Sequence, residues 1–193
     1  MNMRRLAIRG YRSISKADLA LGQITVIIGA SDSGKSNVVR ALRDWAFNAS
    51  GTSFATQGQK VTRVAVVVGH DHKVVFEKNA KGKKSVSRYV TVDAETGEKQ
   101  VFEKIGLSVP QQVVDMTGIR EVVVDDLKVR IHFSEQADPW FLLAPSAWTA
   151  SKVSRIIGRI SGVDALLLAN RDLVNKRSAI SREAKTLRGA GRG

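Results

Sequence analysis

The loop at residues 29–36, which reads GASDSGKS, constrains the fold of this chain more than any other stretch of its sequence. It matches every fixed position of the G-x-x-x-x-G-K-[S/T] pattern, in which the backbone wraps around phosphate groups. The β-branched run at residues 24–28 predicts a buried strand before the loop, and residues 37–45 predict a helix after it. A phosphate-binding loop needs this order of strand, glycine-rich loop and helix. The other interpretation is a glycine-rich turn that binds no nucleotide, and the flanking elements argue against it.

The residue types in this loop indicate how it would hold a nucleoside triphosphate. Gly29 and Gly34 permit backbone angles and close approaches that a Cβ atom would block. The loop amides can then turn inward around phosphate oxygens, and the N-terminal dipole of the following helix adds positive potential. We expect Lys35 to reach the β- and γ-phosphates and the Ser36 hydroxyl to coordinate Mg²⁺.

Composition bounds the class of protein. The 193 residues, 43% of them hydrophobic, are enough for one substantial domain with an appendage. The absence of cysteine excludes disulfides and thiolate metal sites and is compatible with a reducing, intracellular setting. The N-terminus lacks the apolar stretch of a signal peptide, and no apolar run approaches the roughly 20 residues of a membrane span. The formal net charge of +13 favours attraction to a polyanion, although nucleotide binding alone needs only a local positive pocket.

Hydrophobic alternation predicts an α/β fold in which a P-loop nucleotide-binding lobe carries an antiparallel β layer. Residues 3–9 and 17–21 predict two short strands, a small meander that leads into the loop. Between residues 62 and 102, apolar residues alternate with charged ones and turn sequences recur, which predicts about four antiparallel strands. Residues 110–116 predict a short helix with proline in its first turn.

The order of these N-terminal elements resembles the N-terminal lobe of the SMC-like DNA-repair ATPases. Within that group it is most similar to the SbcC-type ATPase subunit of the double-strand-break repair nuclease and its phage-encoded versions. The resemblance rests on a leading strand, the turn GYRSI at residues 10–14, a short strand, and a loop that ends in GKSN. It implies ATP and Mg²⁺ as cofactors and places Arg12 near the nucleotide. The predicted nucleotide contacts are Arg12, Gly29, Ala30, Ser31, Asp32, Ser33, Gly34, Lys35, Ser36 and Asn37.

One departure from the family's pattern falls in the middle of the loop. The family usually carries Asn-Gly there, and this chain has Ser31 and Asp32. The change removes or alters an asparagine contact to phosphate, and Asp32 adds a negative charge near the site. We therefore expect an effect on nucleotide affinity and none on the fold.

A second stretch, residues 133–143, resembles the Q-loop of the same family, because a strand delivers a glutamine into a loop followed by Asp-Pro and bulky apolar residues. The resemblance implies that Gln136 meets Mg²⁺ or the attacking water and couples the nucleotide state to lobe movement. A neutral amide both donates and accepts hydrogen bonds, which suits the orientation of a water molecule. Lys35 and Gln136 are thus the predicted catalytic residues, and Ser36 and Gln136 the predicted metal ligands. The alternative is a polar loop beside an apolar cluster that simply packs.

The other half of the family's active site is harder to find in this chain. The family's C-terminal lobe supplies a Ser-Gly-Gly signature motif, the Walker B acids and a switch histidine, and no Ser-Gly-Gly stretch occurs here. Three valines followed by Asp125 and Asp126 imitate a Walker B strand, in which Asp125 would hold the metal and Asp126 would replace a catalytic glutamate. We favour a hairpin turn at these two residues, because acids commonly close hairpins and a strand pattern resumes at Leu127.

The C-terminal part of the chain predicts helices. Thr149 or Ser151 can cap a helix whose apolar residues recur at helical spacing until Gly162. Residues 163–188 continue with apolar residues separated by many basic ones, and the resemblance implies that they begin a long coiled coil. The expected parts are a P-loop ATPase N-terminal lobe over residues 1–162, a helical extension over 163–188, and a flexible basic tail over 189–193.

We therefore expect an ATP-binding lobe of an SMC/SbcC-like ATPase in double-strand-break repair or recombination, with weak or absent hydrolysis unless a second lobe completes the site. The expected partners are DNA, contacted through its phosphates, a complementary C-terminal ATPase lobe or a second copy of the chain, and a nuclease subunit. The expected location is the cytoplasm of a bacterial or phage-infected cell, with no membrane partner. Two alternatives stay open: a stand-alone small P-loop kinase or GTPase, and a truncated lobe that binds partners without cycling ATP.

Overall fold

The computed structural model describes residues 2–49, 54–69, 71–81, 84–124, 127–134 and 149–190. The chain divides into two compact units, Met1–Arg120 and Glu121–Gly193, each of which is described by itself. The elements of the first unit are β1 (Met3–Tyr11), β2 (Ile14–Ala20), α1 (Lys35–Phe47), β3 (Val61–Val68), β4 (His72–Lys81), β5 (Lys84–Val92), β6 (Lys99–Phe102) and α2 (Gln111–Thr117). Those of the second are β7 (Val122–Val124), β8 (Leu127–Val129), α3 (Ala150–Ser161) and α4 (Val163–Ala190).

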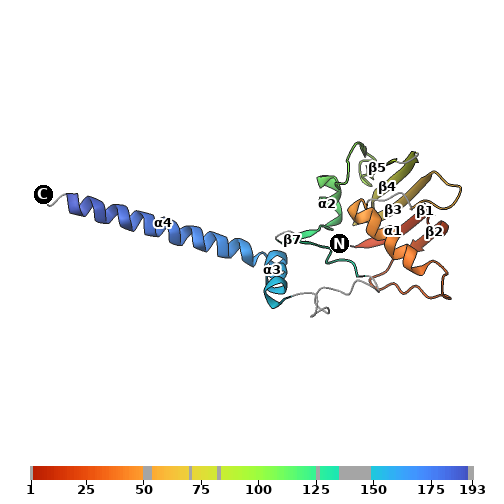
Figure 1. The fold of residues 1–193 in the computed structure, drawn as a ribbon. Coiled ribbons are helices and arrows are strands. Elements are labelled where there is room, and N and C mark those ends of the chain that lie inside the picture. Colours follow the sequence, from red (N-terminus) through yellow and green to blue (C-terminus); the bar gives the residue numbers. More distant parts are fainter. Residues whose placement is uncertain are drawn as a thin grey trace. The chain divides into compact units, whose positions relative to one another are not determined.

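A six-stranded sheet in the order β2-β1-β3-β4-β5-β6 organises the first unit (Figure 1). Every pair of neighbouring strands in it is antiparallel. The strands from β3 to β6 follow one another as hairpins, so that Phe76 of β4 pairs with Val64 on one side and Tyr89 on the other. These pairings confirm the predicted α/β fold with its antiparallel layer and the meander that precedes the loop.

One face of this sheet is covered by α1, which follows the phosphate loop directly (Figure 1). Trp45 of α1 is 1% exposed, its indole N–H donates to the Val74 carbonyl at 3.1 Å, and its own carbonyl accepts from the Tyr89 hydroxyl at 2.6 Å. These contacts fix the helix on the sheet, and the loop is fixed with it. Side chains alternate along each strand, and the core face is lined by Leu6, Ile8, Val64, Val66, Val74, Phe76 and Tyr89.

A buried lysine holds the C-terminal end of α1. The Nζ of Lys78 in β4 donates to the Ala49 carbonyl at 2.5 Å and lies 4.7 Å from the centre of the Phe54 ring. Burial lowers the pKa of the Lys78 ammonium, and the nearby Asp44 carboxylate opposes that shift. A cation at this end of a helix complements the helix dipole, so Lys78 stabilises the helix that carries the loop.

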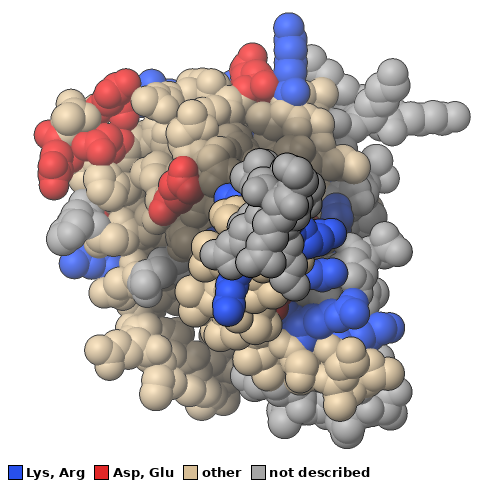
Figure 2. Space-filling model, turned by 90° about the vertical axis from the view of Figure 1, so that its left-hand side faces the viewer, with Lys and Arg blue, Asp and Glu red and all other residues tan. Residues whose placement is uncertain are grey.

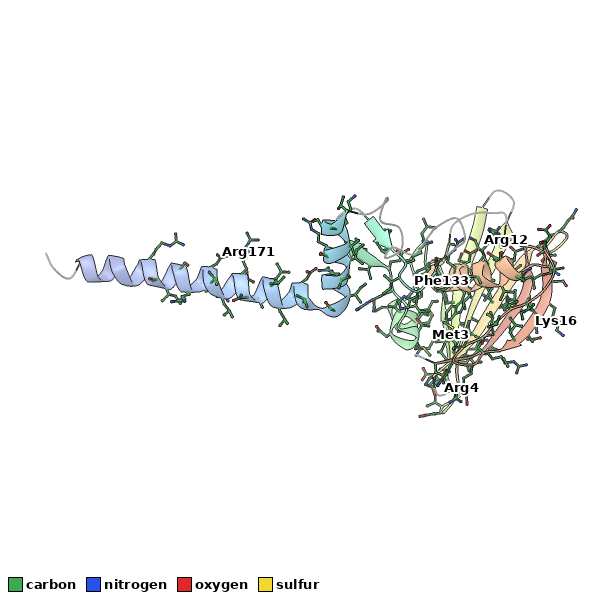
Figure 3. The ribbon with its side chains drawn as sticks, turned by 90° about the horizontal axis from the view of Figure 1, so that it is seen from below. Met3, Arg4, Arg12, Lys16, Phe133 and Arg171 are labelled. Atoms are coloured by element: carbon green, nitrogen blue, oxygen red, sulfur yellow. The ribbon has the colours of Figure 1, made fainter. Side chains whose placement is uncertain are left out.

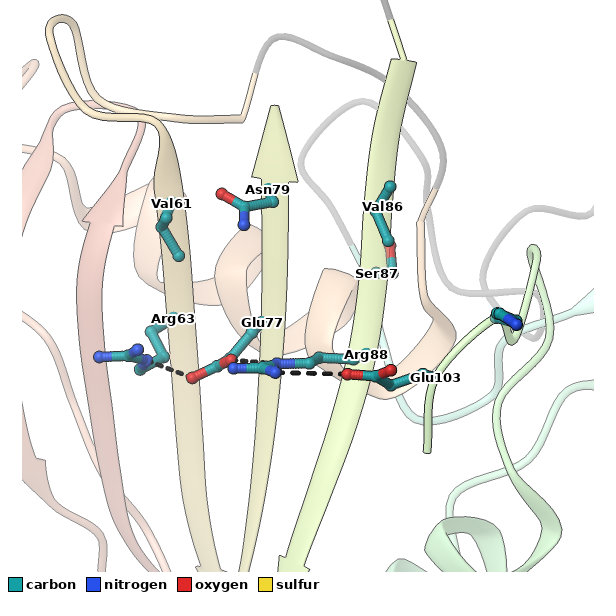
Figure 4. A pocket seen from close by; sticks show the side chains of 9 residues that line it. Val61, Arg63, Glu77, Asn79, Val86, Ser87, Arg88 and Glu103 are labelled. Carbon is teal, nitrogen blue, oxygen red and sulfur yellow. Dashed lines mark hydrogen bonds and ion pairs between the residues drawn. The ribbon is translucent and has the colours of Figure 1, made fainter. Parts of the chain in front are cut away.

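The opposite face of the sheet carries charged side chains in cross-strand rows. Glu77 of β4 accepts hydrogen bonds from Arg63 of β3 and Arg88 of β5, and Arg88 also pairs with Glu103 at 3.4 Å (Figure 4). Burial acts to raise the pKa of the Glu77 carboxyl, but the hydrogen bonds from the two arginines outweigh it and hold that pKa below its usual value. This row keeps the outer face polar, as the charged strand positions predict.

The run at residues 24–28 is not a strand, so the predicted buried strand before the loop is wrong for this structure. Ile24, Val26 and Ile28 are 88%, 74% and 90% exposed, and none of the described strands pairs with them. The physical reason is that β propensity measures how well a residue fits a paired, half-buried surface, and a strand forms only where a neighbour completes its hydrogen bonds. Residues 24–28 are strongly apolar, but none of the described strands lies beside them to complete their backbone hydrogen bonds.

In the second unit, β7 and β8 form an antiparallel pair in which Val124 faces Leu127. This pairing confirms the hairpin interpretation, and the two acids between the strands, Asp125 and Asp126, lie outside the described residues. Ile156 of α3 packs against Val122 and Val129 and is fully buried. The Thr149 hydroxyl caps α3 by accepting from the Lys152 amide at 3.3 Å, and the helix ends at Gly162 with a left-handed φ of 77°.

The last helix, α4, exposes apolar and basic side chains together. Leu166, Leu173 and Ile180 are exposed along it, and Arg171 projects from the same helix (Figure 3). None of the helices in the described residues is long and apolar enough to cross a lipid bilayer. Exposed leucine and isoleucine side chains on a long helix are typical of a surface that pairs with another helix, so the coiled coil stays a prediction.

Candidate nucleotide-binding site

The phosphate loop forms a sharp entry into α1. Gly34 takes a left-handed φ of 92° as the residue before the helix, a conformation that side chains with a Cβ rarely adopt. The Gly34 carbonyl accepts from the Asn37 and Val38 amides at 2.9 and 3.2 Å, which starts the helix. The first turn of α1 therefore directs its unpaired amides toward the loop, where they would donate hydrogen bonds to a bound anion.

The side chain of Lys35 holds the loop together from within. Its Nζ donates to the carbonyls of Gly29 and Ala30 at 2.8 and 2.5 Å. Gly29 lies close to Ser33, since a Cβ on it would lie 2.9 Å from Ser33 Oγ and that side chain would have to move. The ammonium is thus directed to the concave side of the loop, which is where phosphate oxygens would replace the two carbonyls as its partners.

Asp32 occupies a backbone conformation that explains how the loop accommodates an aspartate at this position. Its φ is 59°, in the left-handed region that glycine adopts without strain. Aspartate and asparagine visit this region more readily than other residues with a Cβ, so the turn accepts an aspartate here. The carboxylate is exposed and lies one residue from Ser33 on the rim of the loop.

The turn between β1 and β2, which carries Arg12, contacts the end of the loop through Ser13. The Asn37 side-chain amide donates to Ser13 Oγ at 2.8 Å, and a Cβ on Gly34 would lie only 3.1 Å from the same oxygen. Arg12 comes from this turn (Figure 3), with a left-handed φ of 47° and its guanidinium carbon 5.7 Å from the centre of the Tyr11 ring. Ser13 was not among the residues predicted for the site, and the one feature of the sequence that pointed to it is its position next to Arg12.

The structure describes the remaining predicted residues of the loop but not Gln136. Ala30, Ser31, Ser33 and Ser36 lie exposed in the loop and at the start of α1. Gln136 lies outside the described residues, so its role in catalysis and metal binding stays a prediction. The structure therefore joins Ser13, the neighbour of Arg12, to the start of α1 and describes nothing of the Q-loop, so contact of Arg12 with the nucleotide stays a prediction.

This arrangement fits a nucleoside triphosphate with Mg²⁺. The fit rests on the loop around the Lys35 ammonium, on the amides at the start of α1, and on the exposed Ser36 hydroxyl. The loop and Lys35 would hold the phosphates, and Ser36 would contribute one oxygen to the metal. Mg²⁺ in such sites keeps several waters and takes phosphate oxygens, so a cage of acidic residues is not required. When bound, the metal would neutralise charge on the phosphates.

The fold and the site together define a P-loop nucleotide-binding protein. A family model described as an AAA domain matches residues 5–154 of the chain. The chain belongs to this AAA domain family, whose members are P-loop ATPases. No curated protein matches it in a search of such sequences. The match covers both the loop and the antiparallel sheet, so the family assignment and the geometry agree on nucleotide binding.

Proposed function

We propose that the chain is the ATP-binding lobe of an SMC/SbcC-like ATPase in DNA double-strand-break repair or recombination, and that a complementary lobe completes its site. The observation that carries this proposal is the exposed apolar run at residues 24–28, immediately before the phosphate loop. A nuclease subunit is a further partner in this proposal. A cytoplasmic setting fits it, because DNA and ATP meet there.

The exposed run has the composition of a strand that is buried on both faces. Ile24, Val26 and Ile28 would point to one face of a strand and Ile27 to the other, a pattern typical of central strands in parallel sheets. Burial of each such side chain is worth roughly 1.5–3 kcal/mol, so leaving several of them in water is unfavourable. Strands supplied by a second lobe, either a separate polypeptide or a second copy of the chain, would pair with the run and cover it.

If a second lobe completes the site, the chain alone should bind ATP but hydrolyse it very slowly. The described loop would supply phosphate and metal contacts, but in-line hydrolysis also needs a group that orients the attacking water. With Mg²⁺ present, we expect phosphate release by the chain alone to be at least about a hundredfold slower than the roughly 10 s⁻¹ that is the median for enzymes. A phosphate-release assay measures this, with Lys35→Ala as the control for contaminating ATPases. Turnover at an ordinary rate that Lys35→Ala removes would show that the chain needs no second lobe.

The outer face of the sheet supports the DNA part of the proposal. By strand register, one row contains Arg9 and Arg63, and a second row contains Arg5, Lys73 and Lys99. The rows are four residues apart along the strands, which is about 13 Å. Between them lies a row of small and apolar residues: Ala7, Ala65, Val75, Val90 and Val101. Two rows in which basic residues outnumber Glu77, on either side of an apolar row, suit contact with the phosphates of a nucleic acid duplex.

Charge on the molecule as a whole favours the same partner. The formal net charge is +13, and Figure 2 shows Lys and Arg side chains mainly in the lower right part of the drawn face and Asp and Glu mainly in its upper left part. Within the second row, the charged residues Arg5, Lys73 and Lys99 are all basic and exposed. That row is therefore the better place to test phosphate contact, because the first row also contains Glu77.

Reversing the charge of the second row should weaken DNA binding. For the triple variant Arg5→Glu, Lys73→Glu, Lys99→Glu we expect at least about a tenfold loss of affinity for a short duplex at low salt and a shallower salt dependence. Fluorescence anisotropy at several salt concentrations measures both. The matched control is Arg171→Glu, Lys176→Glu, Arg177→Glu on α4, which changes the net charge equally. Equal losses in the two variants, or no duplex binding by the unchanged chain, would contradict the assignment of DNA to the sheet.

A further inference from the structure

Two hydrogen bonds join the β1–β2 turn to opposite ends of α1. At the start of the helix, Asn37 Nδ2 donates to Ser13 Oγ at 2.8 Å. Near its end, the Tyr11 hydroxyl donates to Asp44 Oδ2 at 2.6 Å. Tyr11 and Asp44 are 1% and 8% exposed, so this second bond is shielded from water and fixes the base of the turn firmly. The Ser13–Asn37 bond is exposed and lies at the phosphate loop itself.

The same turn is held on its other side by residues 54–56. The Arg12 amide donates to the Phe54 carbonyl at 2.7 Å. Thr56 contributes two more bonds, from its amide to the Gly10 carbonyl at 3.0 Å and from its hydroxyl to the Ile14 carbonyl at 3.1 Å. These contacts surround Arg12 and account for its left-handed φ of 47°, which an arginine adopts only where its surroundings impose it.

We propose that Ser13 and Asn37 are positioning residues that lock the β1–β2 turn against the phosphate loop and thereby place Arg12 for contact with nucleotide phosphates. A Cβ on Gly34 would lie 3.1 Å from Ser13 Oγ, so the lock lies directly beside the loop. The Asn37 amide is engaged by Ser13, so Asn37 affects the nucleotide through Arg12. The inference rests on the proposed function, because it takes ATP as the ligand.

The physical reason is preorganisation. An arginine side chain loses considerable rotamer freedom when its guanidinium is fixed on an anion, and a mobile backbone would add to that loss. A turn already tied to the loop removes the backbone part of this cost before the nucleotide arrives. The Arg12 guanidinium also lies 5.7 Å from the Tyr11 ring, which limits where it can move. Loss of the Ser13–Asn37 bond should therefore weaken ATP binding only as far as Arg12 contributes to it.

A double-mutant cycle tests this dependence. We expect Arg12→Ala to lower the affinity for ATP with Mg²⁺ about tenfold, as loss of a charge-assisted hydrogen bond does. Ser13→Ala and Asn37→Ala should each lower it about three- to tenfold in the unchanged background. In the Arg12→Ala background neither should lower it further, because the group that they position is gone. Isothermal titration calorimetry measures all of these affinities.

Ser15→Ala is the matched control, since Ser15 is an exposed serine two residues further on in β2. It should leave the affinity unchanged, and far-UV circular dichroism should show every variant folded. Effects of Ser13→Ala and Arg12→Ala that multiply in the double variant would overturn the positioning role, as would an unchanged affinity in both Ser13→Ala and Asn37→Ala. Absence of ATP binding by the unchanged chain overturns the proposed function, whereas binding that ignores Ser13 and Asn37 overturns this inference alone.

Discussion

Replacing Lys35 with alanine should lower the affinity of the chain for ATP with Mg²⁺ by at least about a hundredfold, or roughly 3 kcal/mol. Two losses add up in this variant. The ammonium would no longer meet the β- and γ-phosphates, and each charge-assisted hydrogen bond of this kind is worth roughly 1.5–3 kcal/mol. The variant also removes the bonds from Lys35 Nζ to the Gly29 and Ala30 carbonyls, so the loop becomes less ordered before binding. Calorimetry or anisotropy of a fluorescent ATP analogue measures the change.

Lys128→Ala is the control for this experiment, because Lys128 is an exposed lysine in β8. It should leave ATP affinity within about twofold of the unchanged chain, since a lone exposed charge contributes little to a distant site. Retained ATP binding in Lys35→Ala would show that the loop is not the nucleotide site. Preference for GTP, or transfer of phosphate to a small acceptor, would favour the stand-alone GTPase or kinase over an ATPase lobe.

The loop and the antiparallel sheet could be predicted because both depend on local pattern. Gly34 and Lys35 stand at fixed positions of a short motif, and the alternation from Arg63 to Val68 marks a strand with one buried face. Such signals need no knowledge of the rest of the chain. The helix after the loop and the end of α3 at Gly162 could be predicted from the local sequence for the same reason.

Features that depend on distant partners could not be predicted in the same way. The run at residues 24–28 has strong β propensity, yet whether it pairs depends on a neighbour that its own residues do not specify. The Ser13–Asn37 contact joins residues 24 positions apart, and a serine in a turn has no sequence signal that it faces an asparagine. At Ile24, Val26 and Ile28 the composition predicted a strand, and the structure shows the three side chains exposed and paired with none of the described strands.

Trp45→Ala should destabilise the first unit by about 3–5 kcal/mol, since substitutions of large core side chains by alanine leave a cavity that the surroundings fill only in part. Trp45 is 1% exposed between α1 and the sheet. The change also removes the indole donor to the Val74 carbonyl, and a buried carbonyl without its partner adds to the cost. Urea unfolding followed by far-UV circular dichroism measures the loss, because fluorescence would lose one of its own reporters.

Two variants separate the reasons for this loss. Trp45→Phe keeps an aromatic ring in the core and removes the hydrogen bond to Val74, so it should cost less than the alanine variant, about 1–3 kcal/mol. Val39→Ala, at a position of α1 that is 41% exposed, should stay within about 0.5 kcal/mol of the unchanged chain. A loss below about 1 kcal/mol in Trp45→Ala would contradict the packing of α1 on the sheet. Because, among the described residues, this helix and the β1–β2 turn hold the phosphate loop against the sheet, that result would also remove the structural basis for the site.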